Sequence, residues 1–194
     1  MTNTLIWLVA ATGLVGAIWL ILRTKTGRPV PAVLRRGRPL PDFEAVDERG
    51  DPVRSTQLHG TATVLLFVRG TWCPFCSAQV KKLTRHYKDI IDLGARLILV
   101  TPKPLETTKR VASFFELEFD FWLDESLHVA RQLGLVVSSG VPSDYEQEYG
   151  TDTVWPTAIV TDAAGIITYV KLSKGFSDRP DPEELLQAIR DQLR

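Results

Sequence analysis

An uninterrupted apolar run that leads directly into an amphipathic helix constrains the fold of this 194-residue chain most. The run ATVLLFV, from Ala62 to Val68, has one polar position in seven, which predicts a strand buried on both faces of a sheet. From Cys76 to Ile90, apolar residues recur at intervals of 4, 3, 4 and 3, the spacing of one helix face, and the helix is expected to end near Gly94. A doubly buried strand followed at once by a helix predicts an α/β fold.

The rest of the chain continues this alternation of strands and helices. Further strands are expected at residues 43–47, 96–101, 119–123, 157–161 and 166–171, and further helices at 106–116, 126–133 and 182–193. Asp181 is expected to cap the last of these helices, and residues 135–154 are expected to form a loop-rich insertion. The pattern predicts a central mixed sheet flanked by helices.

A segment of 18 residues without charge lies near the N-terminus, from Leu5 to Leu22. As a helix it would reach about 27 Å, close to the hydrocarbon thickness of a bilayer. Trp7 and Trp19 lie near its two ends, where aromatic rings favour the membrane interface. The preceding MTNT has no charged side chain and no small-residue cleavage pattern follows, so residues 1–22 are expected to form an uncleaved transmembrane anchor rather than a signal peptide.

Six basic residues follow this segment before the first acidic residue, Asp42. Under the positive-inside rule they place the following domain in the cytoplasm. Residues 23–40 are rich in Pro, Gly and Arg, which predicts a linker along the membrane surface, and residues 41–194 are expected to form one globular domain. The formal net charge of zero offers no polybasic case for nucleic acid, so no such partner is expected.

The chain has two cysteines, Cys73 and Cys76, which lie where the expected buried strand meets the expected helix. Pro74 suits the first helical turn, so Cys73 is expected at the helix N-terminus. Unpaired backbone N–H groups and the positive end of the helix dipole stabilise a thiolate there. We therefore expect Cys73 to attack a disulfide and Cys76 to resolve the mixed disulfide that forms.

Other uses of a cysteine pair fit the chain less well. A tetrahedral zinc site takes four ligands, and the remaining candidates are the isolated histidines His59, His86 and His128. An iron–sulfur cluster would lack two of its four cysteines. Two inert buried thiols would explain neither Trp72 nor the position at a helix start. A redox pair without metal or cofactor is therefore expected.

The stretch VWPTAIV places Pro156 just before a strand, with the bulky Trp155 ahead of it. A cis peptide between Trp155 and Pro156 would form a tight kink. Such a kink would bring backbone close to the cysteine pair, where it could accept a substrate strand and keep stray metals away. Pro156 is therefore a third candidate site residue.

The order of strand, WCPFC, helix, strand, proline before a hairpin, and closing helix resembles the thioredoxin fold. Within it, the chain resembles the peroxiredoxin-like proteins of the alkyl hydroperoxide reductase/thiol-specific antioxidant (AhpC/TSA) family. The matching stretches cover most of residues 40–190 and are LPDFEAVDERGDPV, VLLFVRGTWCPFCSAQVKKL, LGARLILVTP, FWLDESLHVARQLGL and WPTAIVTDAAGIITYVKLSKGFSDRPDPEELLQAI.

The resemblance implies that Cys73 is the reactive thiol, Cys76 its partner and Pro156 a cis-proline. It implies disulfide exchange or antioxidant reduction of peroxides, with a partner reductase or oxidant that resets the dithiol. One position departs from the pattern, because typical peroxiredoxins have Thr or Ser three residues before the reactive cysteine, where this chain has Gly70. Membrane-anchored thioredoxin-like proteins of the cytochrome-maturation type are also similar and usually face the periplasm, which opposes the charge rule.

Other residues near the pair could shape the site. Trp72, Phe75 and Trp155 could form an apolar platform for a protein substrate, and they could equally be packing residues. Arg69, four residues before Cys73, would add positive potential if it pointed toward the site, but it is rather expected to face solvent at the end of a strand. Two acidic residues are expected in surface turns rather than as proton carriers, namely Asp120 and Asp124.

The sequence therefore predicts a membrane-tethered thiol–disulfide oxidoreductase whose substrate is a protein disulfide. Two alternatives stay open, a peroxiredoxin-like peroxidase that takes peroxides and a non-enzymatic assembly module with a redox switch. Turnover separates them, because an enzyme cycles with a reductant whereas a switch reacts once.

Overall fold

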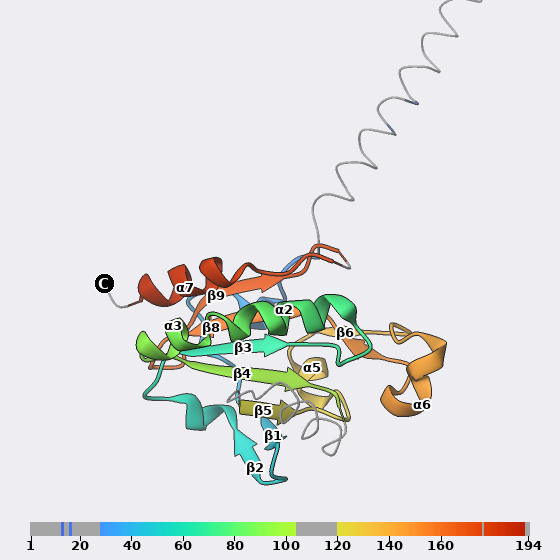
Figure 1. The fold of residues 1–194 in the computed structure, drawn as a ribbon, viewed down its shortest axis with the longest axis horizontal. Helices are drawn as coiled ribbons and strands as arrows, with labels where there is room; N and C mark the ends of the chain where they lie inside the picture. The colour runs from blue at the N-terminus through green and yellow to red at the C-terminus, as the bar shows by residue number, and fades with distance from the viewer. Residues whose placement is uncertain (1–12, 14–15, 17–27, 104–119, 176, 193–194) are drawn as a thin grey trace, which may run out of the picture.

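The computed structural model describes residues 13, 16, 28–103, 120–175 and 177–192. At its centre is a seven-stranded mixed sheet of order β2-β1-β5-β4-β3-β8-β9 (Figure 1). The strands are β1 (Glu44–Asp47), β2 (Pro52–Arg54), β3 (Thr63–Phe67), β4 (Arg96–Thr101), β5 (Asp120–Leu123), β8 (Thr157–Thr161) and β9 (Ile167–Leu172). Strands β3, β4 and β5 are parallel, whereas β8, β9, β1 and β2 join by antiparallel pairing. The predicted α/β fold with a central mixed sheet is confirmed.

Strand β3 shows why the apolar run lacks alternation, because each face of the sheet carries its own core. Val64 and Leu66 point into a core shared with helices α2 (Pro74–Thr84), α3 (Tyr87–Asp92) and α7 (Pro182–Arg190). Leu65 and Phe67 point into a second core with α5 (His128–Gln132). All five residues of β3 are buried, as expected of a strand covered on both faces.

The helix expected from the cysteines to Gly94 is divided into α2 and α3. Helix α2 ends after Thr84, whose hydroxyl donates a hydrogen bond back to the Val80 carbonyl at 3.0 Å. The chain then turns through two residues before α3 begins at Tyr87. The apolar spacing survives this break because Leu83 and Ile90 are buried in the same core.

The insertion at residues 135–154 carries more structure than loops alone. It contains a small antiparallel pair, β6 (Val136–Val137) and β7 (Thr153–Val154), a 3₁₀ turn η3 (Ser143–Tyr145) and the short helix α6 (Glu146–Tyr149). Periodicity failed to indicate these elements because each is at most four residues long. Tyr149 of α6 is buried in the core that also contains Trp72.

The segment expected as a linker, 23–40, packs against the domain from Arg28 onward. Leu34 lies in the short 3₁₀ helix η1 (Ala32–Leu34), and it is fully buried in the core around α5. The backbone N–H of Leu40 donates to the Gly165 carbonyl at 2.9 Å, which ties the segment to the turn between β8 and β9. The two leucines bury apolar surface that a solvated linker would expose, so residues 28–40 form a strap on the domain.

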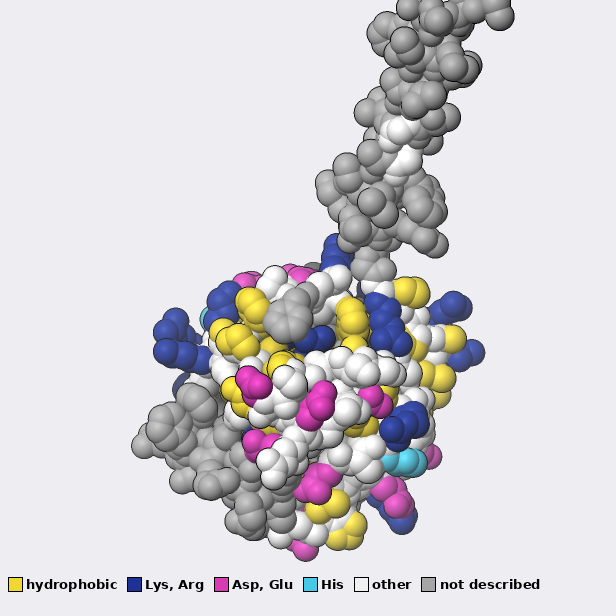
Figure 2. Space-filling model, turned by 90° about the vertical axis from the view of Figure 1, so that its right-hand side faces the viewer, with side chains coloured by type: hydrophobic (Ala, Val, Ile, Leu, Met, Phe, Trp, Pro, Cys, Tyr) yellow, Lys and Arg dark blue, Asp and Glu magenta, His cyan; other side chains and the backbone are white. Residues whose placement is uncertain are grey.

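Two expectations fall on residues that the structure does not describe. The anchor at residues 1–22 lies outside the described residues apart from Gly13 and Gly16, and the helix expected at 106–116 lies wholly outside them. Within the described part of the chain, none of the helices is both long and apolar enough to cross a membrane. On the face shown in Figure 2, acidic and basic side chains are interspersed.

Candidate active site

The cysteine pair lies where β3 leads into α2. Cys73 is the residue before the first helical position and has extended backbone, and Pro74 occupies the first position, where its missing N–H costs nothing. The Cys73 carbonyl accepts hydrogen bonds from the backbone N–H groups of Cys76 at 3.0 Å and Ser77 at 3.1 Å. Both thiols are free, and the exposed fractions of Cys73 and Cys76 are 0% and 2%.

A cation that sequence reasoning missed touches both sulfur atoms. Nη2 of Arg179 donates to Sγ of Cys73 at 3.5 Å and to Sγ of Cys76 at 3.4 Å. Arg179 lies in the loop between β9 and α7, and 106 positions separate it from Cys73. No short-range pattern links residues so far apart, so its place in the site becomes visible only in the folded chain.

The two thiols differ in acidity. The Cys76 thiol donates a hydrogen bond to the Cys73 sulfur, and this is the main reason why the pKa of Cys73 falls to about 6. Burial opposes that fall, whereas the positive charges of Arg179 and Arg69 assist it. The same hydrogen bond raises the pKa of Cys76, and burial and the negative charge of Cys73 raise it further. Cys73 is therefore the more acidic thiol of the pair, and Cys76 is the less acidic one.

Arg69 is part of this site rather than a solvent-facing residue as expected. It is 5% exposed, its Nε donates to the Val154 carbonyl at 3.3 Å, and its guanidinium lies 6.0 Å from the centroid of the Trp72 ring. Burial is the main cause of a lowered Arg69 pKa, which the two cysteines oppose. The prediction that Arg69 faces solvent was wrong, because β7 of the insertion lies over it and provides the carbonyl that its guanidinium binds.

The three aromatic residues of the expected platform have different environments. Trp72 is buried, and its ring packs at 6.4 Å from the rings of both Tyr145 and Tyr149 of the insertion. Trp155 is half-buried, and its indole N–H donates to the Ser173 carbonyl at 2.7 Å. Phe75, between the cysteines, is 37% exposed. Of the three, Phe75 offers the most surface to a substrate, while Trp72 packs under the insertion.

Pro156 lies near the expected place, but its peptide bond is not cis. It precedes β8, whose Thr157 pairs with Phe67 at the end of β3 that leads toward Cys73. Among the described residues no peptide bond is cis, so the prediction for Trp155–Pro156 was wrong. The Pro156 carbonyl accepts a hydrogen bond from Ser173 N–H at 3.0 Å, which extends the β8–β9 pairing. The backbone thus continues the sheet and needs no kink.

Gly70 lies where typical peroxiredoxins have Thr or Ser. The ring of Tyr149 occupies the space that a side chain at Gly70 would take. The backbone of Gly70 has φ +110°, and a Cβ added there would lie 2.5 Å from Cε1 of Tyr149. The next residue, Thr71, shares a hydrogen bond of 3.0 Å between its Oγ1 and the Tyr149 hydroxyl. The threonine hydroxyl beside the site is therefore engaged by the insertion.

A cavity of about 50 Å³ opens beside Cys76 on the side of α2 and β4. Its polar wall includes Thr71, Ser77 and Lys103. Lys103 is buried, its Nζ pairs with Glu148, and it lies 4.4 Å from the centroid of the Tyr149 ring. Two residues of the insertion, Glu148 and Tyr149, thus hold one of the side chains that line this cavity.

The two acidic residues considered as proton carriers, Asp120 and Asp124, each have a structural contact. Asp120 pairs with Arg96 at 2.6 Å, and the Asp124 carboxylate accepts from two backbone N–H groups of α5 at 2.8 and 3.0 Å. Asp124 is buried and accepts from the unpaired N–H groups of the first turn of α5, rather than lying exposed in a turn. Within the described ranges, no three His, Cys, Asp or Glu side chains gather where they could hold a metal ion.

Fold and site together define a redox enzyme of the thioredoxin-like class. Residues 36–170, more than half of the chain, match the model of the AhpC/TSA family, and the chain belongs to that family. Peroxidoxin BcpB from Mycobacterium tuberculosis has a similar fold, with a TM-score of 0.68 and 21% identity, over 81% of this chain and 97% of that one. PrxQ from Xylella fastidiosa also reaches 0.68, with 10% identity, over 83% and 98% of the two chains.

A curated relative adds a second kind of activity to the comparison. The thiol-disulfide oxidoreductase ResA of Halalkalibacterium halodurans is 26% identical over 105 residues, which are 54% of this chain. The matched part is 59% of the length of ResA. The fold is therefore shared with a peroxidoxin and with PrxQ, and the sequence is similar in part to that of a thiol-disulfide oxidoreductase.

Proposed function

We propose that this protein is a thiol–disulfide oxidoreductase in which Cys73 attacks and Cys76 resolves. The observation that carries the proposal is the arrangement of two free thiols at the start of α2, with Nη2 of Arg179 3.5 Å from Sγ of Cys73 and 3.4 Å from Sγ of Cys76. In this arrangement the pKa of Cys73 is lowered to about 6 and the pKa of Cys76 is raised. Near neutral pH this leaves one thiolate and one protonated partner three residues away. A nucleophile and a resolving thiol need these two states.

The reaction follows from these states. The Cys73 thiolate attacks one sulfur of a substrate disulfide, a new S–S bond forms, and the other substrate sulfur leaves as a thiolate. Cys76 then loses its proton to solvent and attacks Sγ of Cys73, so the internal disulfide forms and the second substrate sulfur leaves. Two electrons pass to the substrate, and a dithiol reductase returns them to the protein.

Burial of Cys73 sets a condition on this reaction. Because its exposed fraction is 0%, a protein disulfide reaches the sulfur only when neighbouring side chains move. Nη2 of Arg179, at 3.5 Å, is one group in contact with that sulfur. The cation stabilises the Cys73 thiolate before attack and the leaving Cys73 thiolate when the internal disulfide is reduced.

Stopped-flow fluorescence of the full chain tests the proposal, with Trp72 as the reporter beside Cys73. We expect reaction with a disulfide-bonded protein, repeated turnover with a dithiol reductant, loss of both in Cys73→Ser, and a trapped mixed disulfide in Cys76→Ser. A single reaction without turnover would instead identify a redox switch. Equal rates in Cys73→Ser and the unchanged chain would refute the assigned nucleophile.

Peroxide reduction is the second candidate, and the burial of Cys73 beside Arg179 favours it. A hydroperoxide is small enough for a closed site, and the guanidinium could stabilise the developing negative charge. The Cys73 thiolate would attack one peroxide oxygen, the O–O bond would break, and water or an alcohol would leave, with Cys73 oxidised to a sulfenic acid. Cys76 would then attack Sγ of Cys73, and the disulfide would form with release of water. Gly70 and Tyr149 occupy the place of the threonine that typical peroxiredoxins have, so peroxide reduction needs a direct test. The same stopped-flow experiment with hydrogen peroxide as the oxidant distinguishes a peroxidase from a disulfide exchanger. A rate with peroxide well above that with the protein disulfide would make peroxidase the main activity.

The proposal includes a membrane tether formed by residues 5–22, supported by their length and lack of charge. The six basic residues that follow favour the cytoplasmic face for the catalytic domain. Protease added outside intact spheroplasts would leave a cytoplasmic domain whole. Its digestion under those conditions would place the domain on the outer face instead.

A further inference from the structure

We infer that Ser173 is a positioning residue that holds the Arg179 guanidinium against the two thiols. The inference rests on the proposed thiol chemistry and adds to it the group that keeps the cation in place. Ser173 directly follows β9, and its exposed fraction is 1%.

The backbone of Ser173 is held on both sides. Its N–H donates to the Pro156 carbonyl at 3.0 Å, and its carbonyl accepts from the indole N–H of Trp155 at 2.7 Å. Both partners lie just before β8, next to the end of β3 that leads to Cys73. The Ser173 hydroxyl is therefore fixed relative to the central sheet.

That hydroxyl sits between two groups of the following loop. It donates to the Asp178 carbonyl and accepts from Nη1 of Arg179 at 3.1 Å. Nη1 of Arg179 also donates to the Asp178 carbonyl, at 2.6 Å. Because the guanidinium is planar and rigid, fixing Nη1 also fixes Nη2, which lies 3.4 to 3.5 Å from the two sulfurs.

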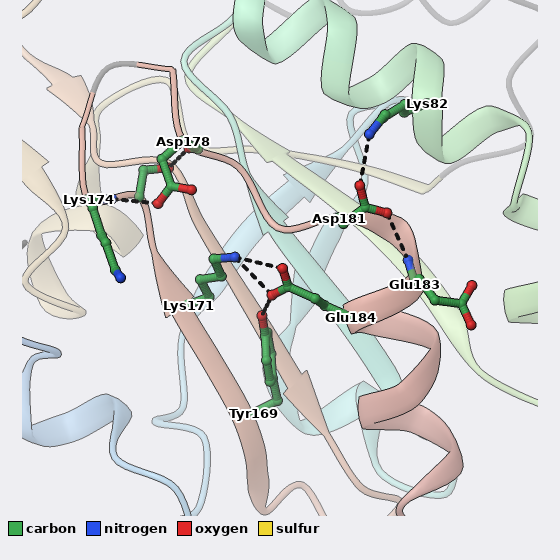
Figure 3. A network of polar contacts seen from close by, with 9 residues as sticks. Lys82, Tyr169, Lys171, Lys174, Asp178, Asp181, Glu183 and Glu184 are labelled. Carbon is green, nitrogen blue, oxygen red and sulfur yellow. Dashed lines mark hydrogen bonds and ion pairs between the residues drawn. The ribbon is translucent and has the colours of Figure 1, made fainter.

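The rest of the loop is tied to the same frame (Figure 3). The Asp178 carboxylate accepts from the backbone N–H of Lys174 at 2.9 Å. Asp181, at the other end, pairs at 2.8 Å with Lys82 of α2, the helix that carries Cys76. These contacts place the loop, while the Ser173 hydroxyl acts on the guanidinium itself.

Removal of the Ser173 hydroxyl should weaken the interaction between the Arg179 guanidinium and the Cys73 thiolate. The charged groups that face Cys73 are Arg179 from the loop and Arg69 from the end of β3, and Cys76 faces it from α2. With Nη1 less restrained, the hydrogen bond from Nη2 to Cys73 is populated less. The thiolate then becomes less favourable, and since the thiolate belongs to the reduced state, the disulfide also becomes harder to reduce.

The test is the Cys73 pKa in the full chain, measured from the pH dependence of alkylation by iodoacetamide. In Ser173→Ala we expect the pKa to rise by about 0.5 to 1 unit, a roughly three- to tenfold loss of thiolate below the pKa. The reduction potential should move to a more negative value. Ser177→Ala, in the same loop but exposed, is the matched control and should change neither quantity.

A double-mutant comparison separates positioning from a general loss of structure. If Ser173 acts through Arg179, Ser173→Ala should add no further pKa shift to Arg179→Ala. An equal shift in both backgrounds, or no shift in either, would overturn the inference. If Ser173→Ala does not fold, Ser173→Gly carries the same comparison. An ordinary thiol pKa in the unchanged protein would overturn the proposed function as well, whereas a low pKa that Ser173→Ala leaves unmoved would overturn only the role of Ser173.

Discussion

At the scale of single residues, the acidity of Cys73 depends first on the thiol beside it. The hydrogen bond from Cys76 is the largest cause of the lowered Cys73 pKa. Alkylation of Cys73 should therefore rise through a midpoint near pH 6 in the unchanged protein, because only the thiolate reacts. In Cys76→Ala the midpoint should move upward toward the ordinary thiol range of about 8.5. Mass spectrometry of the alkylated chain across pH measures both midpoints, and identical midpoints would contradict the assigned cause.

Gly70 is a second residue whose environment makes a quantitative prediction. Its positive φ strains any side chain, and a Cβ would also meet the Tyr149 ring at 2.5 Å. Gly94 also has positive φ, at +74°, but nothing lies within 4 Å of an added Cβ. Gly70→Ala should therefore lower the free energy of unfolding by about 1–3 kcal/mol more than Gly94→Ala, the cost of overpacking. Urea unfolding measures the difference, and equal losses would show that Tyr149 moves aside freely.

At the scale of elements, the strap at residues 28–40 belongs to the folded domain. Leu34 is fully buried, whereas the neighbouring Val33 is 37% exposed. Leu34→Ala should cost about 2–5 kcal/mol of unfolding free energy, as burial of a leucine in a core predicts. Val33→Ala should cost well under 1 kcal/mol. A loss at Leu34 no larger than at Val33 would mean that the strap contributes little to stability.

The same scale shows what local pattern could and could not indicate. The strand at β3, the cysteine position at the start of α2 and the Asp181 cap followed from neighbouring residues, and the structure confirms each. Arg179 reaches the thiols from the other end of the fold, and Tyr149 reaches Gly70 from a four-residue helix. Such contacts depend on tertiary packing, which a pattern of 3.6 or 2 residues does not encode.

At the scale of the whole molecule, contacts of the strap and of the insertion meet near the end of the sheet that carries the thiol site. Trp155 illustrates the arrangement, since Arg28 of the strap lies 5.5 Å from its ring centroid and donates to carbonyls of Gly134 and Val136. Trp155 in turn donates to Ser173, beside the loop of Arg179. The start of the strap, the insertion and the thiol site therefore share a connected region. Residues 5–22 would connect to this region through the strap if they tether the protein.

The tether predicts how the full chain partitions between water and lipid. Vesicles of phosphatidylcholine with phosphatidylglycerol should retain the full chain at high salt, because apolar burial in the bilayer core is not screened by ions. A chain that begins at Arg28 keeps the strap but lacks the 18 uncharged residues and should remain in solution. Retention at low salt with release at high salt would instead indicate attraction of the basic residues to anionic headgroups. Flotation of both chains in a density gradient measures the outcome, and equal flotation at high salt would refute an anchor at residues 5–22.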